Sequence, residues 1–259
     1  DGVATLTGSV DSLVAQDRAL KLASTVRGVR SVVDRIEVKP HWERTDEEIT
    51  EDVLTALAFD PATDSFQIGV QSSGQVVTLE GTVDSWQERR IAEKVAGTVR
   101  GVQDVVNSLE VEYPSERSDE EILGEVEQAL RWNALVDHRL VDVAVEDDVV
   151  TLAGSVGSAA EKNEAVFTSY VYGVEEVDAE GLQVEPWADD EQRQTTYVEA
   201  SDDAIRDAVQ DALVYDPRVD ATEVTVSVKD GVAILRGTVD GLGARRAARQ
   251  DARNTTGVR

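Results

Sequence analysis

The sequence predicts an α+β fold made of tandem repeats of a small αββαβ domain, in which a three-stranded mixed sheet packs against two helices. Three observations carry this prediction. The segment 76–102 recurs three more times along the chain. Helix-capping patterns precede stretches in which apolar residues have helical spacing. Apolar residues alternate with polar ones where strands are expected.

The repeated segment has a strand, a glycine and a helix that ends at Gly-Val. Its four copies begin at Val3, Val76, Val149 and Val232. We place one glycine of each copy in the turn between the strand and the helix. These structural turns are Gly8, Gly81, Gly154 and Gly237, and they are separated by 73, 73 and 83 residues. Solenoid repeats are only roughly 20–50 residues long, so each copy should be a small domain with its own core.

The first repeat, residues 1–40, is partial, because the helix and strand that open a complete unit are missing from it. We expect strands over 3–7 and 31–38 and a helix over 12–27. Pro40 then ends the second strand and begins a short linker. Since the sequence starts inside a repeat, we expect a natural N-terminus, including any signal peptide, to lie outside it.

The second repeat, residues 45–114, is complete. Thr45 and Glu48 have the spacing of a capping box, which predicts the start of a helix. Two alternating strands joined by turn residues at 72–74 predict an antiparallel hairpin. A second capping pattern begins the next helix. The last strand, over 104–111, should lie parallel to the strand before that helix.

The third repeat, residues 118–187, follows the same plan, and the polar segment 188–200 predicts a linker. The fourth repeat, residues 201–259, lacks its last strand. A mixed sheet that lacks a strand has an open edge. We therefore expect the native polypeptide to continue, or another chain to fill that place.

The αββαβ order, the period and two short motifs in each copy resemble tandem BON (bacterial OsmY and nodulation) domains. The motifs are Gly8-Ser9-Val10 with Gly28-Val29, Gly81-Thr82-Val83 with Gly101-Val102, Gly154-Ser155-Val156 with Gly173-Val174, and Gly237-Thr238-Val239 with Gly257-Val258. Four motif pairs in register make the resemblance specific, and it covers nearly the whole chain outside its linkers. It implies a non-enzymatic protein of the periplasm or the extracellular space, linked to osmotic stress.

The resemblance also implies an alternative, because some members of the family contact phospholipid through the first helix of the domain. The corresponding helices of this chain begin with Asp46-Glu47-Glu48, Asp119-Glu120-Glu121 and Asp202-Asp203. Anionic headgroups repel such carboxylates, so the lipid role transfers poorly. A structural or interaction protein of the bacterial envelope or extracellular matrix is the leading interpretation. A phospholipid- or client-protein-binding module of the osmotic-stress response is the alternative.

The composition excludes nucleic acid as a partner. The chain has 52 acidic and 25 basic residues and a formal net charge of −27, which repels polyanions. Acid-rich, lysine-poor chains suggest a halophilic environment, but a high-GC genome would also favour arginine over lysine, so both explanations stay open. No apolar run approaches the roughly 18 residues of a membrane-spanning helix, so we expect no transmembrane segment.

Few residues suit catalysis. The chain has no cysteine and two histidines, which supply neither a catalytic triad nor a repeated metal site. Two Asp-Pro-x-x-Asp patterns, Asp60 with Asp64 and Asp216 with Asp220, suit either calcium or a turn, and we favour the turn. We therefore expect no enzyme activity, no metal and no cofactor.

The charge of the helices points to an interaction surface. The first helices are acidic, whereas the second helices of repeats 1, 2 and 4 have a net positive charge. The candidate surface consists of Arg89, Arg90, Lys94, Arg100, Arg245, Arg246 and Arg249, with Trp42 and Trp187 in the linkers. We expect the two tryptophans to wedge adjacent domains together.

Two interpretations of these charges stay open. Surface charge often only solvates a helix. The sharper hypothesis is that an acidic helix of one domain faces a basic helix of another, within or between chains. Copies of this protein, or other envelope proteins, would then assemble in a salt-sensitive way.

Overall fold

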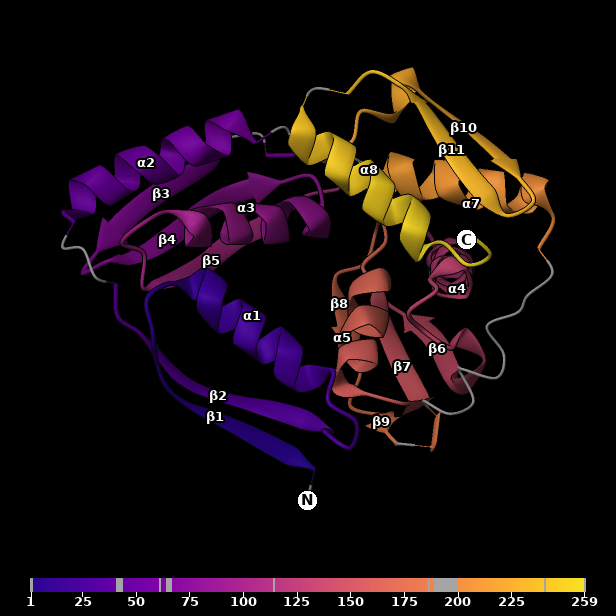
Figure 1. Ribbon diagram of the computed structural model, residues 1–259, viewed down its shortest axis with the longest axis horizontal. Coiled ribbons are helices and arrows are strands. Elements are labelled where there is room, and N and C mark those ends of the chain that lie inside the picture. The colour runs from indigo at the N-terminus through magenta and orange to yellow at the C-terminus, as the bar shows by residue number, and fades with distance from the viewer. Residues whose placement is uncertain are drawn as a thin grey trace. The chain divides into compact units, whose positions relative to one another are not determined.

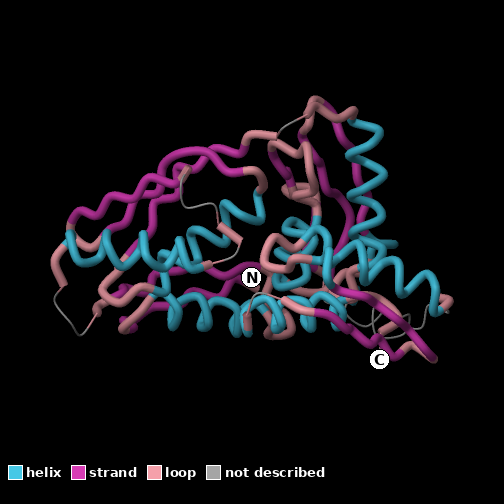
Figure 2. The backbone as a smooth tube through the Cα atoms, turned by 90° about the horizontal axis from the view of Figure 1, so that it is seen from above, coloured by secondary structure: helices cyan, strands magenta, loops and turns pink. Residues whose placement is uncertain are grey.

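The structure is a computed structural model that describes residues 2–40, 44–60, 62–63, 67–113, 115–185, 187–188, 200–239 and 241–258. The chain forms two compact units, residues 1–115 and 116–259, and each contains two repeats. The αββαβ order recurs, in whole or in part, in the four repeats, whose helices and strands are drawn in Figures 1 and 2. The predicted α+β fold of tandem repeats is confirmed.

Repeat 2 shows the complete αββαβ domain. Its elements are α2 (Asp46–Phe59), β3 (Ile68–Ser73), β4 (Val76–Val83), α3 (Trp86–Thr98) and β5 (Asp104–Val111). The central strand β4 pairs antiparallel with β3 through the hairpin and parallel with β5 through the helical crossover. Helices α2 and α3 cover the sheet (Figure 1), and Ile49, Val53 and Ala92 are buried against Val77 and Leu79.

Repeat 1 consists of β1 (Val3–Val10), α1 (Leu13–Ser24) and β2 (Ser31–Val38), with the two strands parallel. The helix ends before the predicted residue 27. The hydroxyls of Ser24 and Thr25 donate to the carbonyls of Lys21 and Leu22 and close its last turn. Over residues 2–40 no apolar side chain is fully buried. This repeat therefore depends on its neighbour for a core.

Repeat 3 differs from repeat 2 in its last strand. Its elements are α4 (Asp119–Trp132), the 3₁₀ helix η1 (His138–Leu140), β6 (Val141–Glu146), β7 (Val149–Val156), α5 (Ala159–Thr168), β8 (Glu176–Asp178) and β9 (Leu182–Val184). Both β8 and β9 pair parallel with β7, where repeat 2 has the single strand β5. Between β8 and β9, residues 179–181 lie opposite residues 152–153 of β7, so the chain has one extra residue there and forms a bulge. The extra residue compensates for the segment from Gly154 to Gly173, which is one residue shorter than the segment from Gly81 to Gly101 in repeat 2.

Repeat 4 consists of α7 (Asp202–Tyr215), η2 (Ala221–Glu223), β10 (Val224–Lys229), β11 (Val232–Gly237) and α8 (Leu242–Asn254). Its described sheet has two antiparallel strands. The side chains of Val232 and Ile234 on β11 are 48% and 42% exposed. The apolar face of α7 is nevertheless buried as in the other repeats, with Ile205 and Leu213 in the core.

The four repeat glycines do not lie in turns. Gly8, Gly81, Gly154 and Gly237 belong to strands, and each has a positive φ. A Cβ on Gly81 would lie within 3.0 Å of the carbonyl oxygen of Gln67, next to the paired strand β3. A Cβ on Gly8 would meet nothing within 4 Å, since no described strand precedes β1. The glycine therefore permits close approach of the hairpin partner rather than a strand-to-helix bend.

The predicted capping boxes differ between first and second helices. At the first helices both reciprocal bonds form, between Thr45 and Glu48 and between Ser118 and Glu121. At the second helix of repeat 2, the Ser85 hydroxyl accepts from the Glu88 amide as expected. The Glu88 carboxylate, however, accepts from the amide of Asp84 at 3.0 Å. The cap therefore reaches one residue further back than predicted.

One aspartate at the start of each first helix has a tertiary role that the sequence analysis missed. The Asp46 carboxylate accepts from the amides of Gly74 and Gln75 in the hairpin turn, at 2.8 and 2.9 Å. These backbone bonds, the one from Gln75 first, lower the pKa of Asp46. Asp119 and Asp202 make the same bonds in repeats 3 and 4. In all three repeats this carboxylate ties the first helix to the hairpin.

Candidate functional site

Arg89 is half-buried, whereas the other cations of the predicted basic surface are exposed. Its guanidinium donates to the carbonyls of Leu109 at 2.8 Å and Asn107 at 2.9 Å, and it lies 4.8 Å from the centre of the Trp86 ring. Arg89 therefore holds α3 to β5 inside its own repeat. Its charge is committed to these carbonyls and to the ring.

The same position has a similar role in two other repeats. Gln16 donates to the carbonyl of Ile36 at 3.2 Å, and Lys162 donates to the carbonyl of Leu182 at 2.7 Å. In each repeat the donor lies four residues after the residue that precedes the second helix. Its long side chain binds the last strand of the repeat. Arg245 occupies this position in repeat 4, where it is exposed. Aligning the four copies could have found this donor before the structure.

The remaining predicted cations are exposed. They are Arg90, Lys94 and Arg100 after or within α3, and Arg246 and Arg249 on α8. On α8 the opposite face carries the buried alanines Ala244, Ala247 and Ala248, so the arginines form an outward stripe. Trp42 lies outside the described residues. Trp187 is described and is 49% exposed.

In the first unit the two second helices contact each other. Leu13 at the start of α1 packs against the apolar core of repeat 2 and lies near Gly97 of α3. A Cβ on Gly97 would come 3.5 Å from the Leu13 side chain. Both helices have more basic than acidic residues. The contact is therefore apolar and joins helices of like charge.

In the second unit the ends of helices α4 and α8 join repeats 3 and 4 through their backbones. The Ala134 amide donates to the carbonyl of Asn254 at 2.7 Å, and the Thr256 amide donates to the carbonyl of Trp132 at 2.8 Å. These bonds make a short antiparallel bridge between Asn133 and Thr255. The bonds satisfy the carbonyls of Trp132 and Asn254, which the C-terminal ends of the two helices leave open.

A cleft of about 390 Å³ lies beside this bridge, between the acidic helices α4 and α7. Its lining includes the carboxylates Glu127, Asp207 and Asp211. Gln128 on α4 donates to Asp211 on α7 at 3.4 Å. Burial, followed by the charges of Asp207 and Glu125, raises the pKa of Asp211. Carboxylates therefore repel one another across the described junction.

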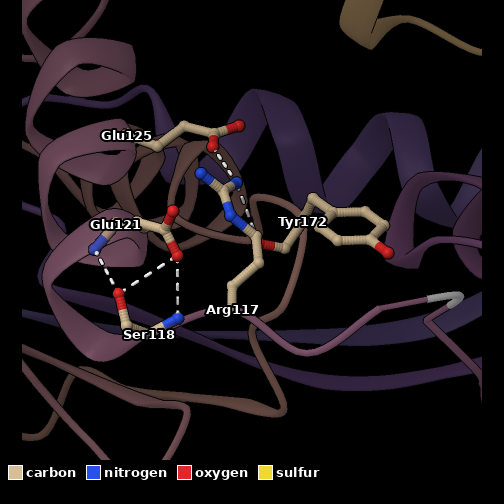
Figure 3. Close-up of polar contacts among 5 residues, drawn as sticks. All are labelled: Arg117, Ser118, Glu121, Glu125 and Tyr172. Atoms are coloured by element: carbon tan, nitrogen blue, oxygen red, sulfur yellow. Dashed lines mark hydrogen bonds and ion pairs between the residues drawn. The ribbon is translucent and has the colours of Figure 1, made fainter.

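An arginine clasp precedes each first helix of repeats 2 and 3. Arg117 forms an ion pair with Glu125 and lies 5.9 Å from the ring centre of Tyr172, beside the Ser118–Glu121 capping box (Figure 3). The hydrogen bond to Glu125 is the main reason that the pKa of Arg117 is raised. In repeat 2, Arg44 pairs with Asp52 at 2.6 Å in the matching places. Repeat 4 has Ala200 and Ala208 there, so the pair is replaced as a unit.

Two of the junction contacts differ from the predicted pairing of acidic with basic helices within a chain, whereas the backbone bridge joins the ends of acidic α4 and basic α8. The contact in the first unit is apolar, and the contacts in the second unit are backbone hydrogen bonds and the bond from Gln128 to Asp211. They bring basic α1 to basic α3, and place acidic α4 and acidic α7 around one cleft. Such junctions should tighten as salt screens the repulsion.

An aromatic residue ends the first helix in each of repeats 2, 3 and 4. The sequence shows this shared position only when phenylalanine, tryptophan and tyrosine are considered together. The residues are Phe59, Trp132 and Tyr215. Trp132 lines the cleft, and burial and the nearby Glu125 raise the pKa of Tyr215. Phe59 is 85% exposed. The aromatic residue at the end of the first helix thus lies at the junction of repeats 3 and 4 in the second unit, whereas it is on the surface of repeat 2 in the first unit.

The two Asp-Pro-x-x-Asp patterns make turn contacts in the part of the chain that the structure describes. Asp60 accepts from the amide of Ala62 at 3.0 Å, Asp216 binds Arg218, and Asp220 accepts from the amide of Thr222 at 3.0 Å. Asp64 lies outside the described residues. Among the described ranges no group of three histidines, aspartates or glutamates is arranged to hold a metal ion. None of the described helices has the length and apolarity needed to cross a membrane.

Comparison with known proteins gives one protein family and one curated relative. The BON domain model matches residues 1–40, 45–113, 118–186 and 201–259. Osmotically-inducible protein Y of Escherichia coli (strain K12) is 35% identical over 113 residues, which are 41% of this chain and 56% of that protein. The chain thus spans about half the length of this relative.

Two solved structures of CdsD, a structural protein of the type III secretion system of Chlamydia trachomatis, align at 14% and 15% identity with TM-scores of 0.22 and 0.23. They cover 70% and 76% of this chain and 84% and 88% of theirs. This similarity is too low to bear on fold or function. The four family matches, by contrast, cover most of the sequence, and the chain therefore belongs to the BON domain family.

Proposed function

We propose that this chain is a non-enzymatic interaction protein of the bacterial envelope or extracellular matrix, whose BON domains bind other proteins, including further copies of the chain, during osmotic stress. The observation that carries the proposal is that its repeats already bind one another through helices in both units. Interfaces between domains of one chain resemble transient interfaces between proteins. Helix surfaces that stay exposed are therefore suited to docking between chains.

The link to osmotic stress rests on the relative named for osmotic induction and on the charge of the chain. A net charge of −27 makes association strongly dependent on ionic strength. The Debye length falls from about 10 Å at 0.1 M salt to about 3 Å at 1 M, so repulsion between copies weakens as the salt concentration rises. An acidic array of this kind would associate to different extents before and after an osmotic shift.

The exposed arginine stripe of α8 is the best candidate for a contact between chains. Arg245, Arg246 and Arg249 lie on its outer face, and the exposed Glu47 and Glu51 of α2 offer opposite charge. A contact between these helices would be steered by charge and weakened by salt. This attraction would act against the general repulsion between the acidic copies. Salt should weaken both, so the contact between helices favours association at low salt, whereas relief of the repulsion favours association at high salt.

Light scattering of the full chain from low to molar salt tests the proposal. We expect concentration-dependent association, reduced at low salt by the variant R245E/R246E/R249E. The matched control R35E/K39E/K229E changes the net charge equally at exposed positions in strands or, for Lys39, directly after one, and should behave as wild type after allowance for net charge. A chain that stays monomeric at every salt and protein concentration would overturn the proposal. So would equal behaviour of the two variants.

The alternative is that the array binds phospholipid, and the exposed end of α2 favours it. Phe59 is 85% exposed and Leu54 is 41% exposed on this helix. Sedimentation with vesicles of anionic phospholipid separates the two functions. Binding by a monomer that the change Phe59→Ser abolishes would support the lipid function. Salt-dependent assembly without sedimentation would support the protein-binding function.

A further inference from the structure

Two carboxyl groups face each other inside repeat 4. Asp251 on α8 lies within hydrogen-bonding reach of Asp216, the residue that caps the C-terminus of α7. Arg218 holds Asp216 from the other side, with its Nε 2.9 and 3.1 Å from the two carboxylate oxygens. The Oδ2 atom of Asp251 is buried and has no hydrogen-bond partner among the described residues. This pair is absent from the sequence analysis.

A hydrogen bond between these two carboxyl groups requires a proton. Two ionised carboxylates have only acceptors, so a hydrogen bond between them cannot form without one. Arg218 stabilises the ionised form of Asp216, which leaves the proton on Asp251. Burial, followed by the adjacent Asp216, raises the pKa of Asp251 to about 8, although Arg218 acts in the opposite direction. Burial and the neighbouring carboxylate therefore both favour the protonated form of Asp251.

Repeat 3 shows that the fold itself does not need this pair. Asn133 and Thr168 occupy the corresponding positions, each 83 residues earlier. The Asn133 amide nitrogen donates to the Thr168 hydroxyl at 2.7 Å. A neutral amide and hydroxyl thus make the contact that two carboxyls make in repeat 4. The titratable version is specific to one repeat.

The carboxyl pair is close to the bridge that joins the two repeats. The Thr255 hydroxyl donates to the carbonyl of Asp251 at 2.9 Å. The adjacent Asn254 and Thr256 make the backbone bonds to α4. Movement of the last turn of α8 would therefore disturb the bridge directly.

We propose that Asp216 and Asp251 share one proton that keeps α8 packed in repeat 4, so that loss of the proton loosens α8 and its bridge to repeat 3. The pair is a pH-sensitive device built into one of the four repeats. The inference is independent of the proposed function, because it concerns only contacts inside the second unit.

The direction of the pH effect follows from proton binding. Asp251 has a higher pKa folded than unfolded, so the folded state holds an extra proton between about pH 4 and pH 8. The stabilisation is complete below the unfolded pKa and is lost as the pH rises through the folded pKa. The opening constant of α8 should rise about tenfold for each pH unit in this range. Above about pH 8 this contribution should level off.

Hydrogen exchange of the full chain, resolved over residues 242–254 and corrected for intrinsic rates, measures this slope. The variant D251N keeps the shape of the side chain but cannot titrate. We expect it to remove the tenfold rise in the opening constant of α8 for each pH unit. The change E223Q, at an exposed carboxyl of repeat 4, is the matched control and should leave the α8 slope unchanged.

A titration of carboxyl carbons by NMR needs no variant and protects the test against misfolding. A wild-type Asp251 signal that titrates several pH units above ordinary aspartates would support the proposal. Titration near pH 4, or equal α8 slopes for wild type and folded D251N, would overturn it.

Discussion

Repeats 3 and 4 follow one plan but use different polar contacts. Repeat 3 has the Arg117–Glu125 clasp and the neutral pair of Asn133 with Thr168. Repeat 4 has two alanines in place of the clasp and the carboxyl pair of Asp216 with Asp251. The polar contacts of this fold can therefore be exchanged while its backbone is kept.

The apolar face of the first helix is shared by the same two repeats. Ile122, Val126 and Leu130 in repeat 3 correspond to Ile205, Val209 and Leu213 in repeat 4, and all six are buried. Repeat 3 closes its core with β8 and β9, whereas the described sheet of repeat 4 has two strands. The comparison teaches that packing of the first helix is common to both repeats, and we expect the more closed sheet of repeat 3 to give it the larger margin of stability.

The largest effect should come from opening the same cavity in both cores. Leu130→Ala and Leu213→Ala should each cost about 2–5 kcal/mol of unfolding free energy. Because repeat 4 has the less closed core, L213A should abolish hydrogen-exchange protection of its strands, whereas L130A should leave repeat 3 folded. Segment-resolved hydrogen exchange makes the measurement. Equal loss of protection would contradict the difference in margin.

The next effect tests a constraint that both repeats share. A Cβ on Gly154 would lie within 3.0 Å of the Leu140 carbonyl oxygen, and one on Gly237 within 3.0 Å of that of Glu223. Each change to alanine should cost about 2–4 kcal/mol through overpacking and backbone strain. Gly8→Ala, with open space around it, should cost only about 1–2 kcal/mol. Urea unfolding compares the three, and a similar cost at Gly8 would mean that φ strain alone explains the glycines.

The clasp should have an intermediate effect. Arg117→Ala removes the partner of a half-buried Glu125 carboxylate and should cost about 1–3 kcal/mol. Arg117→Ala with Glu125→Ala recreates the alanine pair of repeat 4 and should recover part of that loss. Thermal unfolding of the single and double variants gives the coupling. If the double variant is less stable than R117A, the clasp and the alanines are not equivalent solutions.

The smallest effect concerns the cleft between α4 and α7. The pKa of Asp211 is raised, so its share of stability is present at low pH and is lost as the pH rises through the folded pKa. Asp211→Asn should therefore stabilise the junction at pH 7 by a few tenths of a kcal/mol, since the carboxylate is partly desolvated in the cleft but the residue is exposed enough for solvent and salt to screen its charge. The gain should vanish near pH 3 and in molar salt. A destabilisation at pH 7 would show that the bond from Gln128 outweighs the repulsion.

Local signals made much of the fold predictable. Thr45 and Glu48 are three residues apart, and both bonds of their capping box form as expected. The parallel strand over 104–111 also followed from the alternation of its residues and the helix before it. These features depend on neighbours along the chain or on a short crossover, which a single sequence displays.

The rest depended on partners distant in sequence. Arg89 was assigned to the surface because its partner carbonyls belong to residues 18 and 20 positions away. Gly81 was assigned to a turn because the carbonyl that requires it comes from the end of another strand. Asp251 looked like an ordinary surface charge, since Asp216 is in another helix. Backbone carbonyls leave no trace in the sequence, so these contacts needed the fold.

The aspartate that ties the first helix to the hairpin has a consequence for the order of folding. Its bonds span 28 and 29 residues in repeats 2, 3 and 4, so the loop that they close is short for a tertiary contact. Short-range contacts form early. The first helix and the hairpin should therefore assemble as a nucleus before the third strand arrives, and repeat 4 keeps that arrangement of helix and hairpin in a folded chain. Mutating this aspartate should slow folding more than it speeds unfolding.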